Sequence, residues 1–291
     1  MLKIRKSIVS DFILVLVAAI WGGGFVAGKF ALDGFDPIAV LMYRFCGSAL
    51  VMALLFFKHI KKASKKEIKF GLLIGMLQFV GLFLQLFALQ YTTPAKQSFL
   101  AASYVIFTPF IVWWILKEKP LKTEILAAVV SLFGISLISL NEKLIIQIGD
   151  PITILFAVLF AFQIVLIGKY ANDIDILNFT FFQFLTAGVL SVLSVIVFKV
   201  NIISSNPTSI WGTLYLVFIN TALAILLQNF AQRYTKESHV SLIFSFEAIF
   251  GLIFSIFLYN EKISIQIFVG CIIVFSSILI TKFPTKKYFR N

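Results

Sequence analysis

Apolar segments about 20 residues long recur along nearly the whole chain, and this recurrence limits the fold more than any other feature. A helix needs roughly 20 apolar residues to cross about 30 Å of hydrocarbon. About ten such segments fill most of the 291 residues, so no part remains for a soluble domain. The sequence therefore predicts an all-α integral membrane protein with ten transmembrane helices. We expect them near 11–31, 38–57, 70–90, 95–116, 121–140, 151–169, 177–198, 209–232, 238–259 and 263–282.

The composition excludes other classes of protein. The chain is 60% hydrophobic and 13% charged, and soluble domains carry about twice that share of charge. This excludes a soluble globular protein, a disordered chain and a disulfide scaffold. Cys46 and Cys271 both lie in apolar runs and are interpreted as small apolar residues. The first apolar stretch runs on without a small-residue cleavage site, so we interpret it as a span and not as a signal peptide.

The positions of the basic residues predict the orientation. Cytoplasmic loops of membrane proteins are enriched in Lys and Arg. With the N-terminus inside, 19 of the 25 basic residues fall on the cytoplasmic side and 5 on the other, leaving Arg44 within a span. The net charge of +12 therefore indicates orientation and attraction to anionic lipid headgroups, not a nucleic-acid partner. We expect a multi-pass protein of the plasma membrane, most naturally a bacterial inner membrane, with both termini cytoplasmic.

The two halves of the chain resemble each other. Residues 85–98 read QLFALQYTTPAKQS and residues 228–241 read QNFAQRYTKESHVS, with six polar, aromatic or small residues matched at one offset. The same offset pairs Glu118 with Glu261. We therefore predict two repeats, residues 1–143 and 144–291. Each repeat has five spans, an odd number, so the second enters the membrane in the opposite sense. This inverted topology is typical of alternating access around a midplane site.

Several motifs identify a family. Trp21 is followed by Gly22, Gly23, Gly24 and Phe25 in the first predicted span, and Arg44-Phe45 stands in the second. The fourth and ninth spans each close with a Glu. Together these features resemble the EamA branch of the drug/metabolite transporter superfamily, over nearly the whole chain. The resemblance implies a ten-helix fold, a central cavity lined by both halves, and peripheral fifth and tenth helices. The second half departs from the pattern, because Gln183 replaces Arg44 and the Trp-Gly-Gly run is missing.

Two charged side chains are predicted at membrane depth. A charge there costs roughly 2.5–3.5 kcal/mol on insertion scales, so it normally faces a bundle interior or an aqueous cavity. Glu247 lies near the middle of the ninth span, where it could bind a cation or a proton during transport or form a structural ion pair. Arg44 lies at a similar predicted depth. We expect an Arg44–Glu247 pair or a shared polar cavity, with snorkelling of Arg44 to the headgroups as the alternative.

A matched polar face on the third and eighth spans predicts the lining of that cavity. Gln78 and Gln85 are two helical turns apart, so they share a side of the helix. The repeat offset carries them to Thr221 and Gln228, with Asn220 nearby. Interhelical hydrogen bonding is the alternative role for these groups. The full predicted cavity set is Trp21, Gln78, Gln85, Tyr104, Gln163, Gln183, Thr221 and Gln228.

Glycine and proline mark candidate hinges. Gly22, Gly23 and Gly24 weaken the first helix, since each costs about 1 kcal/mol against alanine. Gating and close helix packing are both consistent with them. Pro109, within the fourth span, is expected to bend that helix beside the cavity.

No catalytic or metal-binding pattern is visible in the sequence. There is no phosphate-binding loop, no nucleophile spaced from a base, and no His or Cys ligand pattern. We therefore predict a transporter without a cofactor, for which proton coupling is chemically available, and not an enzyme. Its solute is expected to be a small organic metabolite, most simply an amino acid or a related zwitterion or cation, and it is expected to be exported. Import of a nucleoside-like or methyl-donor metabolite, a membrane-embedded enzyme and a non-transporting scaffold are the alternatives.

Overall fold

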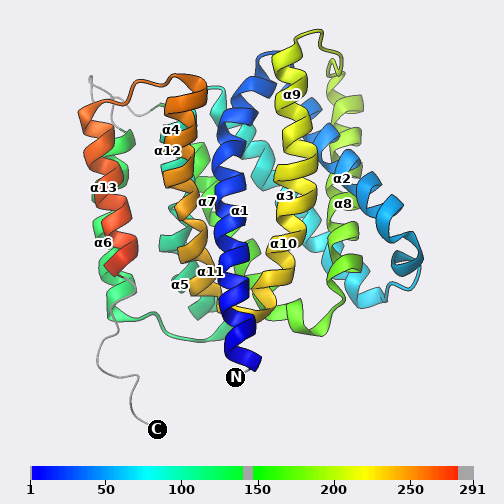
Figure 1. Cartoon of the computed structure of the whole chain (residues 1–291), viewed down its shortest axis with the longest axis horizontal. Helices are drawn as coiled ribbons and strands as arrows, with labels where there is room; N and C mark the ends of the chain where they lie inside the picture. Colours follow the sequence, from blue (N-terminus) through cyan, green and yellow to red (C-terminus); the bar gives the residue numbers. More distant parts are fainter. Residues whose placement is uncertain (1, 140–146, 281–291) are drawn as a thin grey trace.

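The computed structural model describes residues 2–139 and 147–280, and every regular element in those ranges is a helix (Figure 1). The predicted all-α class is therefore confirmed. The predicted boundary between the repeats, at 143/144, lies outside the described residues. The elements are α1 (Leu2–Leu32), α2 (Pro37–Ile60), α3 (Lys65–Leu89), α4 (Pro94–Ala101), α5 (Tyr104–Leu116), α6 (Lys122–Ser139), α7 (Gly149–Tyr170), η1 (Ala171–Asp173), α8 (Ile176–Phe198), α9 (Pro207–Tyr215), η2 (Leu216–Leu223), α10 (Ala224–Ala231), η3 (Gln232–Tyr234), α11 (Glu237–Phe244), α12 (Phe246–Tyr259) and α13 (Ile265–Ile280).

The described residues contain eight helical segments that are long and apolar enough to cross a membrane. They coincide with eight of the predicted spans, where α4 and α5, the run from α9 to η3, and α11 and α12 each form one segment. The predicted fifth and tenth spans correspond to α6 and α13, with 18 and 16 residues. In Figure 1 these two helices lie together at one edge of the bundle. The count of ten crossings stays a prediction.

Side-chain caps determine where equivalent helices begin. The Asp36 carboxylate accepts a hydrogen bond from the Ile38 N–H at 2.8 Å, and Pro37 follows as the first residue of α2. Asp175, 139 residues later, caps α8 by accepting from the N–H groups of Leu177 and Asn178. Caps of this kind satisfy N–H groups that the helix itself leaves without partners. The second helix of each half therefore starts by the same device.

Glu67 joins the start of α3 to the start of α8. Its carboxylate accepts from the N–H of Ser64, which completes a capping box, and also from the Asp175 N–H and the Asn178 side chain. One carboxylate thus serves three donors, which ties together two helices from different halves of the chain.

Replacing Glu67 with alanine is expected to lower the free energy of unfolding by about 1–3 kcal/mol, since one buried and two partly buried donors lose their acceptor. The measurement is thermal unfolding of the detergent-solubilised protein. Glu124→Ala is the matched control, because within residues 2–139 and 147–280 the Glu124 carboxylate accepts only from the nearby Leu121 N–H. An equal fall in Tm for both variants would contradict the inter-helical role of Glu67.

Two helices are broken at equivalent points. The fourth predicted span divides at Ala102 and Ser103, and the ninth divides at Ser245, 143 residues after Ala102. The two segments also end alike, because Lys117 and Asn260 adopt left-handed backbone angles and are again 143 residues apart. Pro109 lies inside α5, beyond the break at Ala102 and Ser103, and the bend expected at this proline stays a prediction.

The helices of the two halves pack across each other in matched pairs. Helix α1 packs on α12, and α7, which opens the second half, packs on α5; α3 packs on α8, and α2 packs on η2. In Figure 1 the chain passes from α4 down to α5, and from α11 up to α12, so these matched segments run in opposite directions. We call the end of the bundle at which the chain begins the N-terminal end, and the other the distal end.

Candidate functional site

A cavity lies where the two halves meet. Its volume is about 50 Å³, enough for a few water molecules. It is lined by residues of α1, α2, α3, α4, α7, η2, α10 and α12. The lining residues are Trp21, Gly24, Phe25, Arg44, Leu77, Gln78, Gly81, Leu82, Gln85, Leu86, Leu89, Gln97, Phe156, Phe160, Gln163, Asn220, Ile225 and Glu247.

Arg44 is held in the cavity wall by two side chains of the second half. Its Nε donates to Thr221 Oγ1 at 2.9 Å, and its Nη2 donates to Asn220 Oδ1 at 2.8 Å. Only 4% of its surface is exposed, so the side chain does not snorkel to the headgroups. No ion pair within the described residues includes Arg44. The guanidinium therefore carries a buried charge that neutral partners position but do not neutralise.

Glu247 is the second residue of α12, just after the break at Ser245. Its exposed fraction is also 4%, and among the described residues no basic group lies within ion-pair distance of its carboxylate. The Tyr104 hydroxyl approaches this carboxyl without a hydrogen bond of standard geometry. Of the two arrangements expected for Arg44 and Glu247, the structure has the shared cavity and not the direct pair.

The amide groups form a second, related set of contacts. The Gln183 side chain donates to Gln78, and Asn229 donates to Gln183 Oε1 at 2.9 Å. Arg44 and Gln183 are equivalent positions of the two predicted repeats, as are Thr221 and Gln78. The Arg44–Thr221 and Gln183–Gln78 contacts are therefore the same contact made once from each half.

Of the eight residues predicted to line the cavity, four lie in its wall and four do not. Trp21, Gln78, Gln85 and Gln163 line it. Gln183 and Thr221 point their polar atoms at Gln78 and Arg44, which line it, and Gln228 donates to Gln232. Tyr104 is fully buried beside Glu247. The other four predicted residues lie behind the wall, because hydrogen bonds hold Gln183, Thr221 and Gln228 there and packing holds Tyr104.

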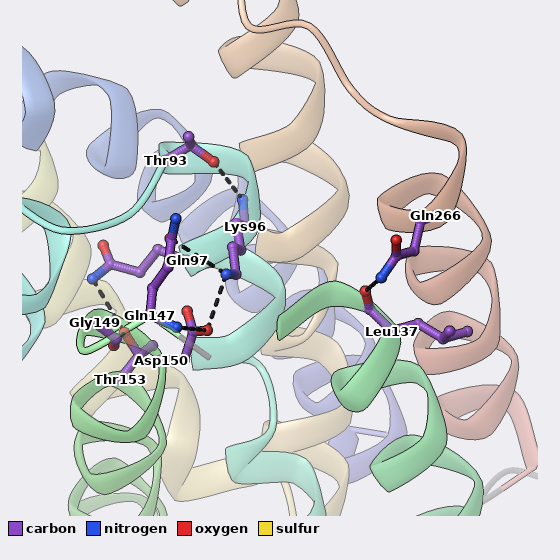
Figure 2. Close-up of polar contacts among 9 residues, drawn as sticks. All are labelled: Thr93, Lys96, Gln97, Leu137, Gln147, Gly149, Asp150, Thr153 and Gln266. Carbon is purple, nitrogen blue, oxygen red and sulfur yellow. Dashed lines mark hydrogen bonds and ion pairs between the residues drawn. The ribbon is translucent and has the colours of Figure 1, made fainter. Parts of the chain in front are cut away.

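Gln97 lines the cavity but was not among the predicted residues. Its Nε2 donates to the Gln85 carbonyl at 2.7 Å, whereas its Oε1 is buried without a partner. Gln163 Nε2 is likewise buried and unpartnered. Gln97 stands seven residues before Tyr104, two helical turns on the same predicted span, and this spacing could have identified it. Figure 2 shows Gln97 beside Lys96 and above Thr153.

An aromatic cluster borders the cavity. The Trp21 ring lies 4.8 Å from the Phe244 ring and 5.4 Å from the Phe160 ring, centroid to centroid. Tyr104 packs edge-on against Phe160 at 5.0 Å. The Trp21 indole N–H donates to the Asn220 carbonyl at 3.2 Å. Such a surface can contact the apolar part of a solute while the amides and the two charges bind its polar groups.

The three glycines of α1 lie at close helix contacts. A Cβ on Gly22 would overlap Phe250 of α12, one on Gly23 would lie 2.8 Å from the Tyr215 hydroxyl, and one on Gly24 would overlap the Asn220 side chain. Helix α1 is continuous through all three residues. Their positions thus favour close packing over a hinge in this conformation.

No group of three or more His, Cys, Asp or Glu side chains in the described part of the chain could hold a metal ion. The cavity offers amides, one guanidinium, one carboxyl and aromatic faces. This combination can bind an organic solute that carries charge. It contains no nucleophile positioned beside a base.

Comparisons with known proteins agree with this geometry. Residues 8–140 and 147–283 each match a family described as the EamA-like transporter family. An uncharacterized transporter of Archaeoglobus fulgidus is 30% identical over 275 residues, covering 94% of this chain and 86% of its own. The uncharacterized transporter YoaV of Bacillus subtilis is 23% identical, with 97% and 98% covered. A crystal structure with 12% identity has a TM-score of 0.71 over 96% of both chains, and shows that the fold is shared.

Proposed function

The chain belongs to the EamA-like transporter family, and from this premise we propose that it exports amino acids or related zwitterions and cations. One observation carries the proposal. Arg44 and Glu247 line the same cavity, and neither has an oppositely charged partner among the described residues. Removing one partner from a buried pair of charges is strongly unfavourable. The cavity now has room for a few water molecules only, but in a wider conformation a solute with both a carboxylate and an ammonium would supply the two missing partners together.

Each lining group has a role in this proposal. Arg44, held by Thr221 and Asn220, binds the carboxylate of the solute. Glu247 binds its ammonium or, when the cavity is empty, a proton. Gln97 Oε1 and Gln163 Nε2 are buried polar atoms without partners, so a polar solute would satisfy them. Trp21 and Phe160 contact its apolar part.

Alternating access is the proposed mechanism. Two five-helix repeats of opposite orientation, 1–143 and 144–291, would rock about the cavity between them. The matched helix breaks and the matched Arg44–Thr221 and Gln183–Gln78 contacts support this division. We place the protein in the plasma membrane, with its termini cytoplasmic, on the distribution of basic residues.

Flux in proteoliposomes tests the function. Purified protein should move radiolabelled zwitterionic amino acids faster than empty liposomes do, and a pH gradient should change the rate. The Arg44→Gln variant should lose affinity for amino acids by at least roughly 30-fold, the effect of removing one partner from a buried charged contact. It should affect amines that lack a carboxylate much less.

Arg233→Gln is the matched control, because Arg233 lies outside the cavity and donates to the Ile174 carbonyl at 3.3 Å. It should leave flux unchanged. If no solute of the panel moves under any gradient, the proposal fails. Equal losses for amino acids and for simple amines would remove the assigned role of Arg44.

A further inference from the structure

Two ion pairs join the halves of the chain at opposite ends of the bundle. At the distal end, Lys96 Nζ of α4 lies 2.9 Å from Asp150 Oδ2 of α7 (Figure 2). At the N-terminal end, His239 Nε2 of α11 lies 3.4 Å from Asp11 Oδ2 of α1. We call them the distal tie and the N-terminal tie. Each one connects the first half of the chain to the second.

The ties are equivalent in the repeat. The offset of 143 that pairs Gln85 with Gln228 also pairs Lys96 with His239. The offset of 139 that pairs Arg44 with Gln183 also pairs Asp11 with Asp150. The distal tie and the N-terminal tie are therefore one contact that occurs twice, once at each end.

The two ties differ in strength in this conformation. The side chains of Lys96 and Asp150 are 7% and 2% exposed, whereas those of His239 and Asp11 are 45% and 34% exposed. Asp150 Oδ2 also accepts from the Gln147 N–H at 3.1 Å. Exposed ion pairs are screened by water and contribute little, and histidine carries a charge only when it is protonated. Asp11 Oδ1 accepts from the Thr235 hydroxyl at 3.3 Å as well, but Asp11 is much more exposed than Asp150, so the distal end is held together more firmly.

A second matched contact shows the same asymmetry. The Glu261 carboxylate accepts from the Ala95 N–H at 3.1 Å, next to Lys96, and so connects the second half to the start of α4. The equivalent residues at the N-terminal end are Glu118 and Ser238, and no hydrogen bond joins them among the described residues. A cavity of about 560 Å³ lies there instead, lined by Glu118, Ser238 and His239 among others.

We infer that the Lys96–Asp150 pair is the distal gate of the transport pathway and that the His239–Asp11 pair is its N-terminal counterpart, each of which breaks when its own end of the bundle opens; in this conformation both are in contact and the distal pair is the buried one. The inference rests on the proposed transport function. Two rocking halves cannot separate at an end where a buried ion pair joins them. The present conformation is therefore closed at the distal end, and Lys96 is next to Gln97, which lines the cavity. Neither pair touches the solute in this scheme, so these four are positioning residues.

Thiol labelling in nanodiscs, where both ends of the protein are accessible, tests the inference without a solute. The background carries Cys46→Ala and Cys271→Ala. One reporter, Gln85→Cys, lies in the central cavity, and a second, Val112→Cys, lines the cavity at the N-terminal end. Asp150→Asn weakens the distal tie, and His239→Lys makes the N-terminal tie resemble the distal one. Each of these two variants, made separately, should raise the labelling rate at position 85 about tenfold and lower the rate at position 112.

Asp36→Asn is the matched control, because Asp36 is a distal aspartate whose hydrogen bond stays within its own half, to Ile38. It should change neither rate. If Asp150→Asn fails to fold, His239→Lys still decides the question, since it leaves the distal tie intact. Rates equal to those of Asp36→Asn would overturn the inference. If labelling shifts as expected but no solute moves in proteoliposomes, the proposed function fails and the gates stand.

Discussion

Glu247→Gln is expected to reduce the affinity for zwitterionic and cationic solutes by at least roughly 30-fold, the equivalent of about 2 kcal/mol. Glutamine has nearly the same shape as glutamate but cannot carry the negative charge. The variant should therefore fold while losing the group that binds an ammonium or a proton. Because Glu247 is the one acidic residue among those that line the cavity, no other acid of the cavity wall can replace it.

The measurement is solute flux at several pH values on the two sides of the proteoliposome. With Glu247 in place, an imposed proton gradient should change the rate. With glutamine at this position the rate should not respond. Asp33→Asn is the matched control, since Asp33 is an exposed acid that does not line the cavity. Unchanged flux and unchanged pH dependence in Glu247→Gln would remove both the binding role and proton coupling from this residue.

Hydrophobic length made the fold predictable from the sequence. The predicted spans agree with helix bounds to within five residues, as in 38–57 against α2 (Pro37–Ile60), except at the start of α1, which begins at Leu2 and not near residue 11. Such agreement is expected in a membrane, where backbone groups must be satisfied within each helix. The breaks at Ala102 and Ser245 carry no glycine or proline at the break itself. They depend on packing between helices, which a single-sequence pattern does not express.

The cavity was predictable in part because buried charge is rare. Arg44 and Glu247 stood out as charges within apolar runs, and both line the cavity. The direction of each amide was not predictable, since Gln78 faces the cavity while Gln183, its hydrogen-bond partner, lies behind it. Residue type and membrane depth identify both glutamines as candidates, but the rotation of each helix about its axis decides which of them faces the cavity. The Asp11–His239 contact joins residues 228 positions apart, and only the matched offsets connect it to Lys96 and Asp150.

Gly22→Ala is expected to destabilise the protein by about 1–3 kcal/mol, the usual effect of overpacking a tight contact. An added Cβ would overlap the Phe250 side chain and would lie 2.8 Å from the backbone nitrogen of Gly251. Backbone atoms cannot move aside as the end of a flexible side chain can, so α1 and α12 would have to separate. This effect opposes the gain in helix propensity of about 1 kcal/mol that alanine brings.

For Gly81→Ala, at another glycine within a helix, we expect the opposite effect on stability. The nearest atom to its added Cβ is Phe156 Cδ2, at 3.6 Å, an ordinary contact. The propensity gain should therefore dominate, and Tm in detergent should stay the same or rise, while Gly22→Ala lowers it by several degrees. The comparison also separates the two roles expected for the glycines of α1. If Gly22→Ala leaves Tm unchanged but slows flux, the glycine acts in gating, because close packing would affect the resting structure first.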